Sequence, residues 1–178
     1  ATTSATPLSE FPSRGVSATA VWNGRLLTFG VSPNGYSSGR TFSYDPTSDV
    51  WTEQRYFGGA PLTIGGYSGV SGAALLGGSV YVTGGSGWGF TYSILNIFDP
   101  AANSWTQGPD HPIPTTSGLS GVINGKLYVY TPAAPSGATG ALHVFDPATQ
   151  RWTALTPPPR PHGGAGGVIG GQLYLVGG

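Results

Sequence analysis

Apolar runs along this chain are short, rich in β-branched and aromatic residues, and separated by clusters of glycine, proline and polar residues. Runs bounded in this way by turn-forming residues are typical of β-strands. Between pairs of runs stand Asn-Gly or Gly-Gly dipeptides, whose residues accept the positive φ of a two-residue hairpin turn. These dipeptides occupy 23–24, 77–78, 124–125 and 170–171. The pattern therefore predicts an all-β chain of antiparallel hairpins, in which no helix is evident.

A second motif begins with an aromatic residue followed by Asp-Pro and ends with a Trp. It occurs at 44–51, 98–105 and 145–152. Asp accepts backbone N–H groups at the start of a turn, and Pro presets φ at the next position, so each copy predicts a tight turn between two antiparallel strands. Trp51, Trp105 and Trp152 are large apolar groups, and we expect each to pack between its own sheet and a neighbouring one.

The two motifs recur with a period that matches a unit of four short strands. The predicted units cover about 14–55, 66–108, 116–156 and, in part, 162–178, and residues 1–13 look like the last strand of a preceding unit. The first strand of each unit consists mainly of small residues and is rich in Gly. Such strands can pack closely around a common axis, so we expect them to be the inner strands. A β-propeller has this organisation, with four-stranded antiparallel blades around a central channel.

The succession of an apolar strand, a Gly-Gly or Asn-Gly turn, Leu-Tyr-Val, Gly-Gly, and then aromatic-Asp-Pro with its Trp resembles the kelch repeat, over about residues 14–178. The departures are Gly30-Val31 and Thr131-Pro132 in place of the Gly pair, and Leu27 in place of the Tyr. The resemblance implies a propeller that acts mostly as a binding or interaction platform and occasionally as an enzyme. The predicted ring is incomplete in this chain, so we expect either further repeats or a homo-oligomer that closes it.

Composition and charge narrow the possible partners. Only 8% of residues are charged, with seven basic and seven acidic side chains, so there is no electrostatic footprint for nucleic acid or an anionic membrane. The chain has no Cys, which excludes disulfides, Cys-ligated zinc and the Tyr–Cys cross-link of kelch-like copper-radical oxidases. His111, His143 and His162 lack metal-ligand spacing, so no metal or other cofactor is expected, and His143 is expected to be structural. A weakly charged composition rich in Thr, Ser, Gly and Ala would suit an exported bacterial protein.

The long connections between blade strands are the better place to look for a binding site, because they vary while the hairpin turns are stereotyped. The connection at 86–93 carries three aromatic residues spaced by glycine, which is more than a surface connection needs. Together with aromatic residues of neighbouring connections, including Phe57, they could stack sugar rings or hold an apolar peptide side chain; the alternative is that they pack between blades. The candidate ligand-binding residues are Tyr36, Arg55, Tyr56, Trp88, Phe90, Tyr92, His111, Arg160 and His162.

Three functional hypotheses remain open on the sequence. The first is a non-catalytic binding or assembly module that takes a protein or saccharide ligand on the face formed by the long connections. The second is part of an exported carbohydrate-active enzyme, as in kelch-like sugar epimerases, which clustered acidic and basic residues at the channel mouth would favour. The third is a purely structural or engineered scaffold. No residue is assigned a catalytic role, and the charge-poor composition favours the binding module.

Overall fold

A computed structural model describes residues 18–31, 40–54, 70–87, 90–116, 118–132, 140–159 and 165–176, and confirms the all-β prediction for them. Each full sheet is an antiparallel meander in which consecutive strands are neighbours. The first sheet consists of β1 (Ala18–Trp22), β2 (Arg25–Val31), β3 (Arg40–Asp45) and β4 (Val50–Glu53). The second consists of β5 (Gly72–Leu76), β6 (Ser79–Gly87), β7 (Phe90–Asp99) and β8 (Ser104–Gln107). The third consists of β9 (Leu119–Ile123), β10 (Lys126–Thr131), β11 (Ala141–Asp146) and β12 (Arg151–Leu155), and β13 (Ala165–Ile169) pairs with β14 (Gln172–Val176) as a hairpin.

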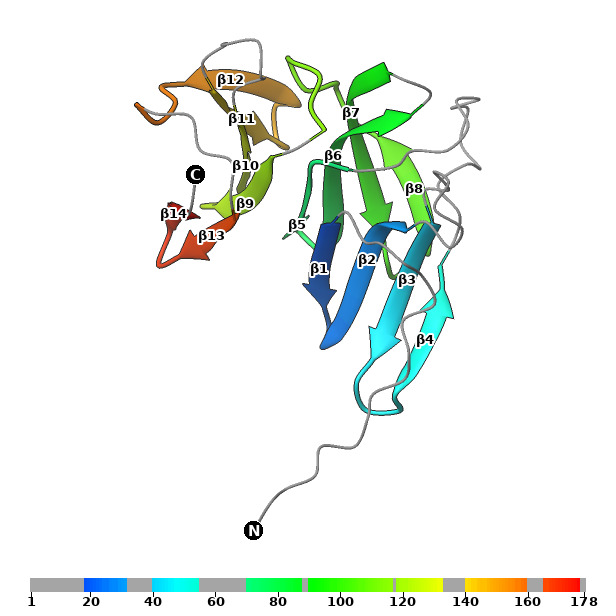
Figure 1. Ribbon diagram of the computed structural model, residues 1–178. Coiled ribbons are helices and arrows are strands. Elements are labelled where there is room, and N and C mark those ends of the chain that lie inside the picture. Colours follow the sequence, from blue (N-terminus) through cyan, green and yellow to red (C-terminus); the bar gives the residue numbers. More distant parts are fainter. Residues whose placement is uncertain are drawn as a thin grey trace.

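The first strands of successive sheets lie side by side. β1 contacts β5, β5 contacts β9 and β9 contacts β13, while the sheets spread outward from this row (Figure 1). Small residues allow the approach: a Cβ on Gly72 would come within 2.5 Å of Ser120 Oγ, and one on Gly121 within 2.5 Å of Val168 Cγ2. The Gly-rich inner strands predicted from the sequence are therefore explained by crowding around a common axis.

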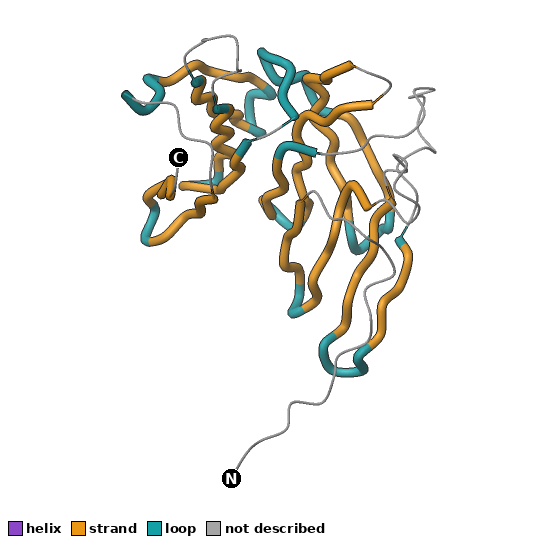
Figure 2. The backbone as a smooth tube through the Cα atoms, viewed as in Figure 1, coloured by secondary structure: helices purple, strands orange, loops and turns teal. Residues whose placement is uncertain are grey.

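Two kinds of tight turn join the strands at one end of the sheets, here named the turn face (these turns are among the teal segments in Figure 2). The two-residue turns have the positive φ expected of the primed hairpin types, for example 47° at Asn23 and 75° at Gly24. The Asp-Pro turns are held by the Asp side chain. Asp45 Oδ1 accepts the Thr47 N–H at 2.9 Å, and Asp146 Oδ1 accepts the Ala148 N–H at the same distance. Both turn predictions are confirmed.

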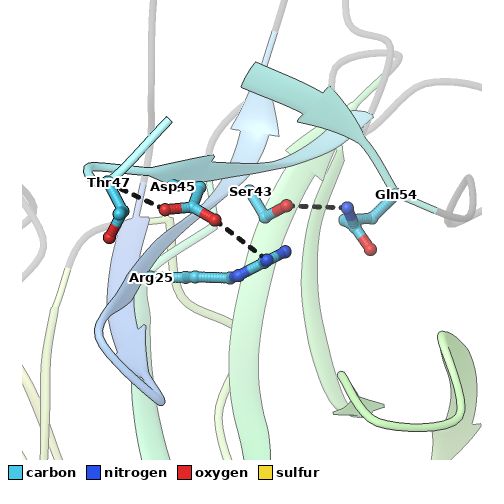
Figure 3. Close-up of polar contacts among 5 residues, drawn as sticks. All are labelled: Arg25, Ser43, Asp45, Thr47 and Gln54. Atoms are coloured by element: carbon cyan, nitrogen blue, oxygen red, sulfur yellow. Dashed lines mark hydrogen bonds and ion pairs between the residues drawn. The ribbon is translucent and has the colours of Figure 1, made fainter. Parts of the chain in front are cut away.

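Basic residues that follow two of the hairpin turns reach these Asp-Pro turns. Arg25 Nη2 donates to Asp45 Oδ2 at 2.9 Å (Figure 3), and Lys126 Nζ lies 2.8 Å from Asp146 Oδ2. The second sheet has Ser79 at the corresponding position. The two ion pairs lie between exposed or half-buried side chains, where water screens the attraction, so each contributes little to stability. Each ion pair joins the second and third strands of its sheet at the turn face.

Apolar side chains alternate between the two faces of each sheet, so each full sheet can pack against two neighbours. Along β6, Val80 and Val82 face the first sheet, where they meet Leu27 and Phe29. Tyr81 points the other way, into a cluster with Leu127, Val129 and Phe145 of the third sheet. The core is thus a series of layers between sheets, and the members of these clusters named here are 9% exposed or less.

The motif tryptophans lie in these layers as predicted for two of the three copies. Trp105 packs edge-on against Phe29 of the first sheet, with ring centroids 5.8 Å apart. Trp152 contacts His111, which precedes its own sheet, at 4.8 Å. Trp51 lies on Tyr44 of its own sheet at 4.8 Å. Trp105 and Trp152 therefore face the preceding sheet.

One element differs from the prediction. The sequence placed the end of a strand at Gly84-Gly85 and a loop over 86–93, but β6 continues to Gly87 and β7 begins at Phe90. The register shifts between Thr83 and Gly85, where the φ values of Gly84 and Gly85 are 65° and 135°. The glycine pair is thus a bulge inside a longer hairpin, since glycine accepts the conformation that a bulge requires. Among the described residues no helix is long and apolar enough to cross a membrane.

Candidate functional site

The end of the sheets opposite the turn face carries the connections between β2 and β3, β6 and β7, and β10 and β11, and the segments that lead to the next sheet. We name it the connection face. The β6–β7 hairpin is longer than the other strand pairs in the described parts of the chain, with Gly85 opposite Tyr92 and Gly87 opposite Phe90. Phe90 is 67% exposed at the start of β7. Burial of such a ring by a ligand would remove a large apolar surface from water.

Segment 108–116, which leads from the second sheet to the third, is fastened to the base of this hairpin. The Gly108 N–H donates to Leu95 O, the Thr115 N–H donates to Tyr92 O at 3.0 Å, and the Gly85 N–H donates to Thr115 O at 2.8 Å. Thr115 is buried, and Gly84 lies against it. Segment 108–116 therefore forms hydrogen bonds with both strands of the hairpin, β6 and β7, and these bonds hold the base from which the exposed Phe90 ring projects.

His111, a candidate ligand-binding residue, lies inside the layer between the second and third sheets. It is 2% exposed, its ring lies 4.8 Å from that of His143, and its Nδ1 is 2.7 Å from Ile113 O. Because a carbonyl can only accept, Nδ1 donates and carries the proton of the neutral ring. Burial lowers the pKa of both histidines. His111 thus packs away from the surface at which a ligand would arrive, and His143 is buried in β11 beside it.

Three of the candidate residues lie within the described ranges: Phe90, Tyr92 and His111. Tyr92 is partly buried two residues from Phe90, and its backbone carbonyl holds the segment that carries His111. The structure therefore places these three residues in one region, with the Phe90 ring exposed to solvent and the His111 ring buried between the second and third sheets. Six candidates lie outside the described residues: Tyr36, Arg55, Tyr56, Trp88, Arg160 and His162. Phe57 also lies outside them.

Acidic side chains in the described ranges are engaged in local contacts. Asp45, Asp99 and Asp146 hold the Asp-Pro turns; Asp49 accepts from Tyr44 Oη, Glu53 pairs with Arg40, and Asp110 accepts from Gln107. The Thr47 N–H and the Arg25 charge hold the pKa of Asp45 below its ordinary value, and Lys126 does the same for Asp146. Such carboxylates stay ionised and suit turn formation, whereas a general acid needs a raised pKa. No group of three potential metal ligands occurs among the residues that the structure describes.

Four hydroxyl side chains in or next to the second and third sheets were missed by sequence reasoning: Ser71, Thr83, Ser120 and Thr131. Thr83 Oγ1 lies 3.3 Å from Ser120 Oγ across the second and third sheets. Ser71 Oγ and Thr131 Oγ1 are buried without a hydrogen-bond partner in the described structure. Ser and Thr are common throughout this chain, so only the spatial arrangement distinguishes these four.

Comparisons with known proteins bear on the fold. No family model matches the chain, and no curated protein matches it. The solved structure of YjhT matches with a TM-score of 0.67 at 22% identity, over 89% of this chain and 55% of that one. The fold is propeller-like. The likeness to YjhT at this identity concerns the fold alone, and the chain spans about half the length of the protein it matches.

Proposed function

We propose that this chain is a kelch-type propeller module that binds a ligand or partner on its connection face without catalysing a reaction. The observation that carries the proposal is Phe90, a ring 67% exposed on a hairpin whose base is held by segment 108–116. An exposed aromatic ring in a chain of which only 8% of residues are charged suits a sugar ring or an apolar peptide side chain as its ligand.

The described carboxylates support binding over acid–base chemistry. Asp45 and Asp146 have lowered pKa values and hold turns at the opposite end of the sheets. The ion pair on the connection face, between Arg40 and Glu53 at 3.6 Å, joins the third and fourth strands of the first sheet and is half exposed. The kelch assignment itself rests on the repeated turn motifs, whose Asp and Gly residues occupy the conformations that those motifs need.

The test is a binding measurement with a panel of neutral and acidic oligosaccharides and of peptides that carry one aromatic residue. Phe90→Ser removes the exposed ring, and Val50→Ser is the matched control, since Val50 is 49% exposed on the turn face. We expect a panel member to bind, with affinity lowered at least tenfold by Phe90→Ser and unchanged by Val50→Ser. Absence of binding across the panel, or equal binding by Phe90→Ser, would contradict the proposal. Interconversion of sugar epimers by the chain would favour the enzyme hypothesis instead.

A further inference from the structure

Segment 108–116 crosses from the second sheet to the third and buries two of its side chains, those of His111 and Thr115. Its other residues are exposed or half-buried. Three of them are prolines, which have no backbone N–H to donate. The position of the segment therefore depends on its remaining contacts, and the ring of His111 is the larger of the two groups that it places between the sheets.

The contacts that hold this segment centre on His111. The backbone N–H of His111 donates to Ser93 O at 2.6 Å, and its Nδ1 donates to Ile113 O at 2.7 Å. Its ring lies 4.8 Å from that of Trp152, whose Nε1 donates to Pro109 O at 3.0 Å. These bonds lie at His111 and on both sides of it in the chain, so the ring cannot leave the layer while all of them persist.

Thr115 links the same segment to the hairpin that carries Phe90. Its N–H donates to Tyr92 O in β7, and its carbonyl accepts the Gly85 N–H in β6. Gly85 stands opposite Tyr92 in this hairpin. Displacement of segment 108–116 would therefore break a hydrogen bond on each strand at the base of the hairpin.

The layer around His111 accommodates a neutral ring. His111 Nε2 and His143 Nδ1 are buried without a hydrogen-bond partner in the described structure, and the two rings lie 4.8 Å apart at 87°. Because Nδ1 of His111 already donates to Ile113, protonation would place a charged N–H at Nε2, where no described group accepts it. A buried charge without a partner is costly, and a second charge on His143 would add repulsion.

Other titratable groups do not offset such a charge. Tyr81 of β6 lies in the same layer, and burial raises its pKa above the ordinary 10.0, so it is neutral in mild acid. Asp110, next to His111 in the chain, is exposed and accepts from Gln107 Nε2 at 3.4 Å. The charged side chains in the described strands of the second and third sheets lie at the turn face: Asp99, Lys126, Asp146 and Arg151.

We propose that mild acid opens segment 108–116 by charging His111 and His143, and thereby releases the base of the hairpin that carries Phe90. Burial holds the pKa of both histidines below 6.5 in the closed segment, so below that pH the open segment takes up more protons. The open population then rises, at most about tenfold per pH unit for each histidine. The effect on a ligand rests on the proposed function, because a site whose base has opened should bind its ligand more weakly.

The test is hydrogen exchange of single amides, followed by NMR at about pH 7 and about pH 5.5, on either side of the ordinary histidine pKa. Each rate is expressed as protection relative to the unfolded chain at the same pH, which removes the intrinsic effect of pH. We expect the amides of His111, Thr115 and Gly85 to lose protection together in acid, by at least about tenfold. The amides of β2, in the first sheet, should keep theirs.

Three variants assign the response to the histidine pair. His143→Phe removes one charge and leaves the bond from His111 to Ile113, so the loss of protection in acid should be smaller than in the wild type. The double variant His111→Phe/His143→Phe should show no such loss. Asp110→Asn is the matched control, since it neutralises the exposed carboxylate beside His111, and it should respond to acid as the wild type does.

The panel oligosaccharide or peptide that binds at about pH 7 should bind at least about threefold more weakly at about pH 5.5, and the double variant should bind it equally at both. Unchanged protection of the three amides in the wild type would overturn the proposal. An equal loss in β2 would also overturn it, because the whole chain would then be unfolding, as would a loss that His143→Phe leaves unaltered. Failure of the panel to bind would contradict the proposed function alone, since the exchange measurement needs no ligand.

Discussion

Trp152 shows how a single side chain joins two sheets. Its ring packs on Phe145 of its own sheet at 5.0 Å and on His111 at 4.8 Å, and its Nε1 donates to Pro109 O at 3.0 Å. The indole therefore combines apolar contact with a hydrogen bond to the segment that precedes its sheet, which explains why Trp suits this position better than another aromatic residue.

We predict that Trp152→Ala lowers the free energy of unfolding by about 3 to 5 kcal/mol, the range for emptying a large packed site. Trp152→Phe keeps most of the ring and loses the hydrogen bond to Pro109, so it should cost less, with about 1 kcal/mol from the bond. Urea denaturation of the two variants and the wild type measures both. A midpoint that hardly moves in Trp152→Ala would place the ring outside the packed layer.

The buried histidine pair predicts a pH dependence of stability. His111 and His143 have pKa values below the ordinary 6.5, because burial disfavours the charged ring. As the pH falls below 6.5 the unfolded chain takes up protons that the folded chain does not, so stability decreases until the lowered pKa values are passed. The slope is at most about 1.4 kcal/mol per pH unit for each histidine.

His143→Phe tests this pH dependence because it removes the titratable ring. The first sheet has Phe42 at the corresponding position, so the fold accepts phenylalanine there. We expect the variant to lose part of the decline in stability between pH 6.5 and 5, measured by denaturation across that range. Asp45 and Asp146 contribute a separate loss at lower pH, because their pKa values lie below the ordinary 3.8 and their stabilising contribution disappears as they become protonated. An unchanged slope in His143→Phe would assign the decline to other groups.

At the scale of one element, the β6–β7 hairpin depends on the bulge at Gly84. Its φ is 65°, and a Cβ there would come within 2.3 Å of Thr115 O and 2.6 Å of Ser71 Oγ. We predict that Gly84→Ala destabilises the protein by about 2 to 4 kcal/mol, from a left-handed backbone and a forced shift of segment 108–116. Gly77→Asn is the control, because Gly77 has open space around it and Asn23 and Asn124 occupy the same turn position. It should change stability by less than about 0.5 kcal/mol.

The strands and turns were predictable because their signals are local. Asn-Gly and Asp-Pro fix backbone conformation within a few residues, and they did so at Asn23, Asn124 and Asp45. The bulge at Gly84 was not predictable. A glycine pair at the end of a strand and a glycine pair inside a longer hairpin have the same sequence pattern, and only the pairing with β7 distinguishes them. The position of His111 likewise depends on a contact with Trp152, far along the chain, that no local pattern reveals.

For the whole molecule, packing is directional. Residues of one face of the second sheet meet the first sheet, and residues of its other face meet the third sheet, as Val80 and Tyr81 show within a single strand. A repeat protein of this kind gains stability from nearest-neighbour contacts, so each sheet depends mainly on those beside it. The second sheet has a described neighbour on both sides, whereas the described neighbour of β13–β14 is the third sheet.

Because the second sheet and the β13–β14 hairpin differ in the number of described sheets that they contact, we expect them to unfold locally at different frequencies. The backbone amides of β6, between two packed layers, should exchange with deuterium only in the rarest openings, whereas those of β14 should exchange early, since fewer contacts must break to release them. The time course of deuterium uptake, followed in peptides from β6 and β14, would report the coverage of each sheet separately.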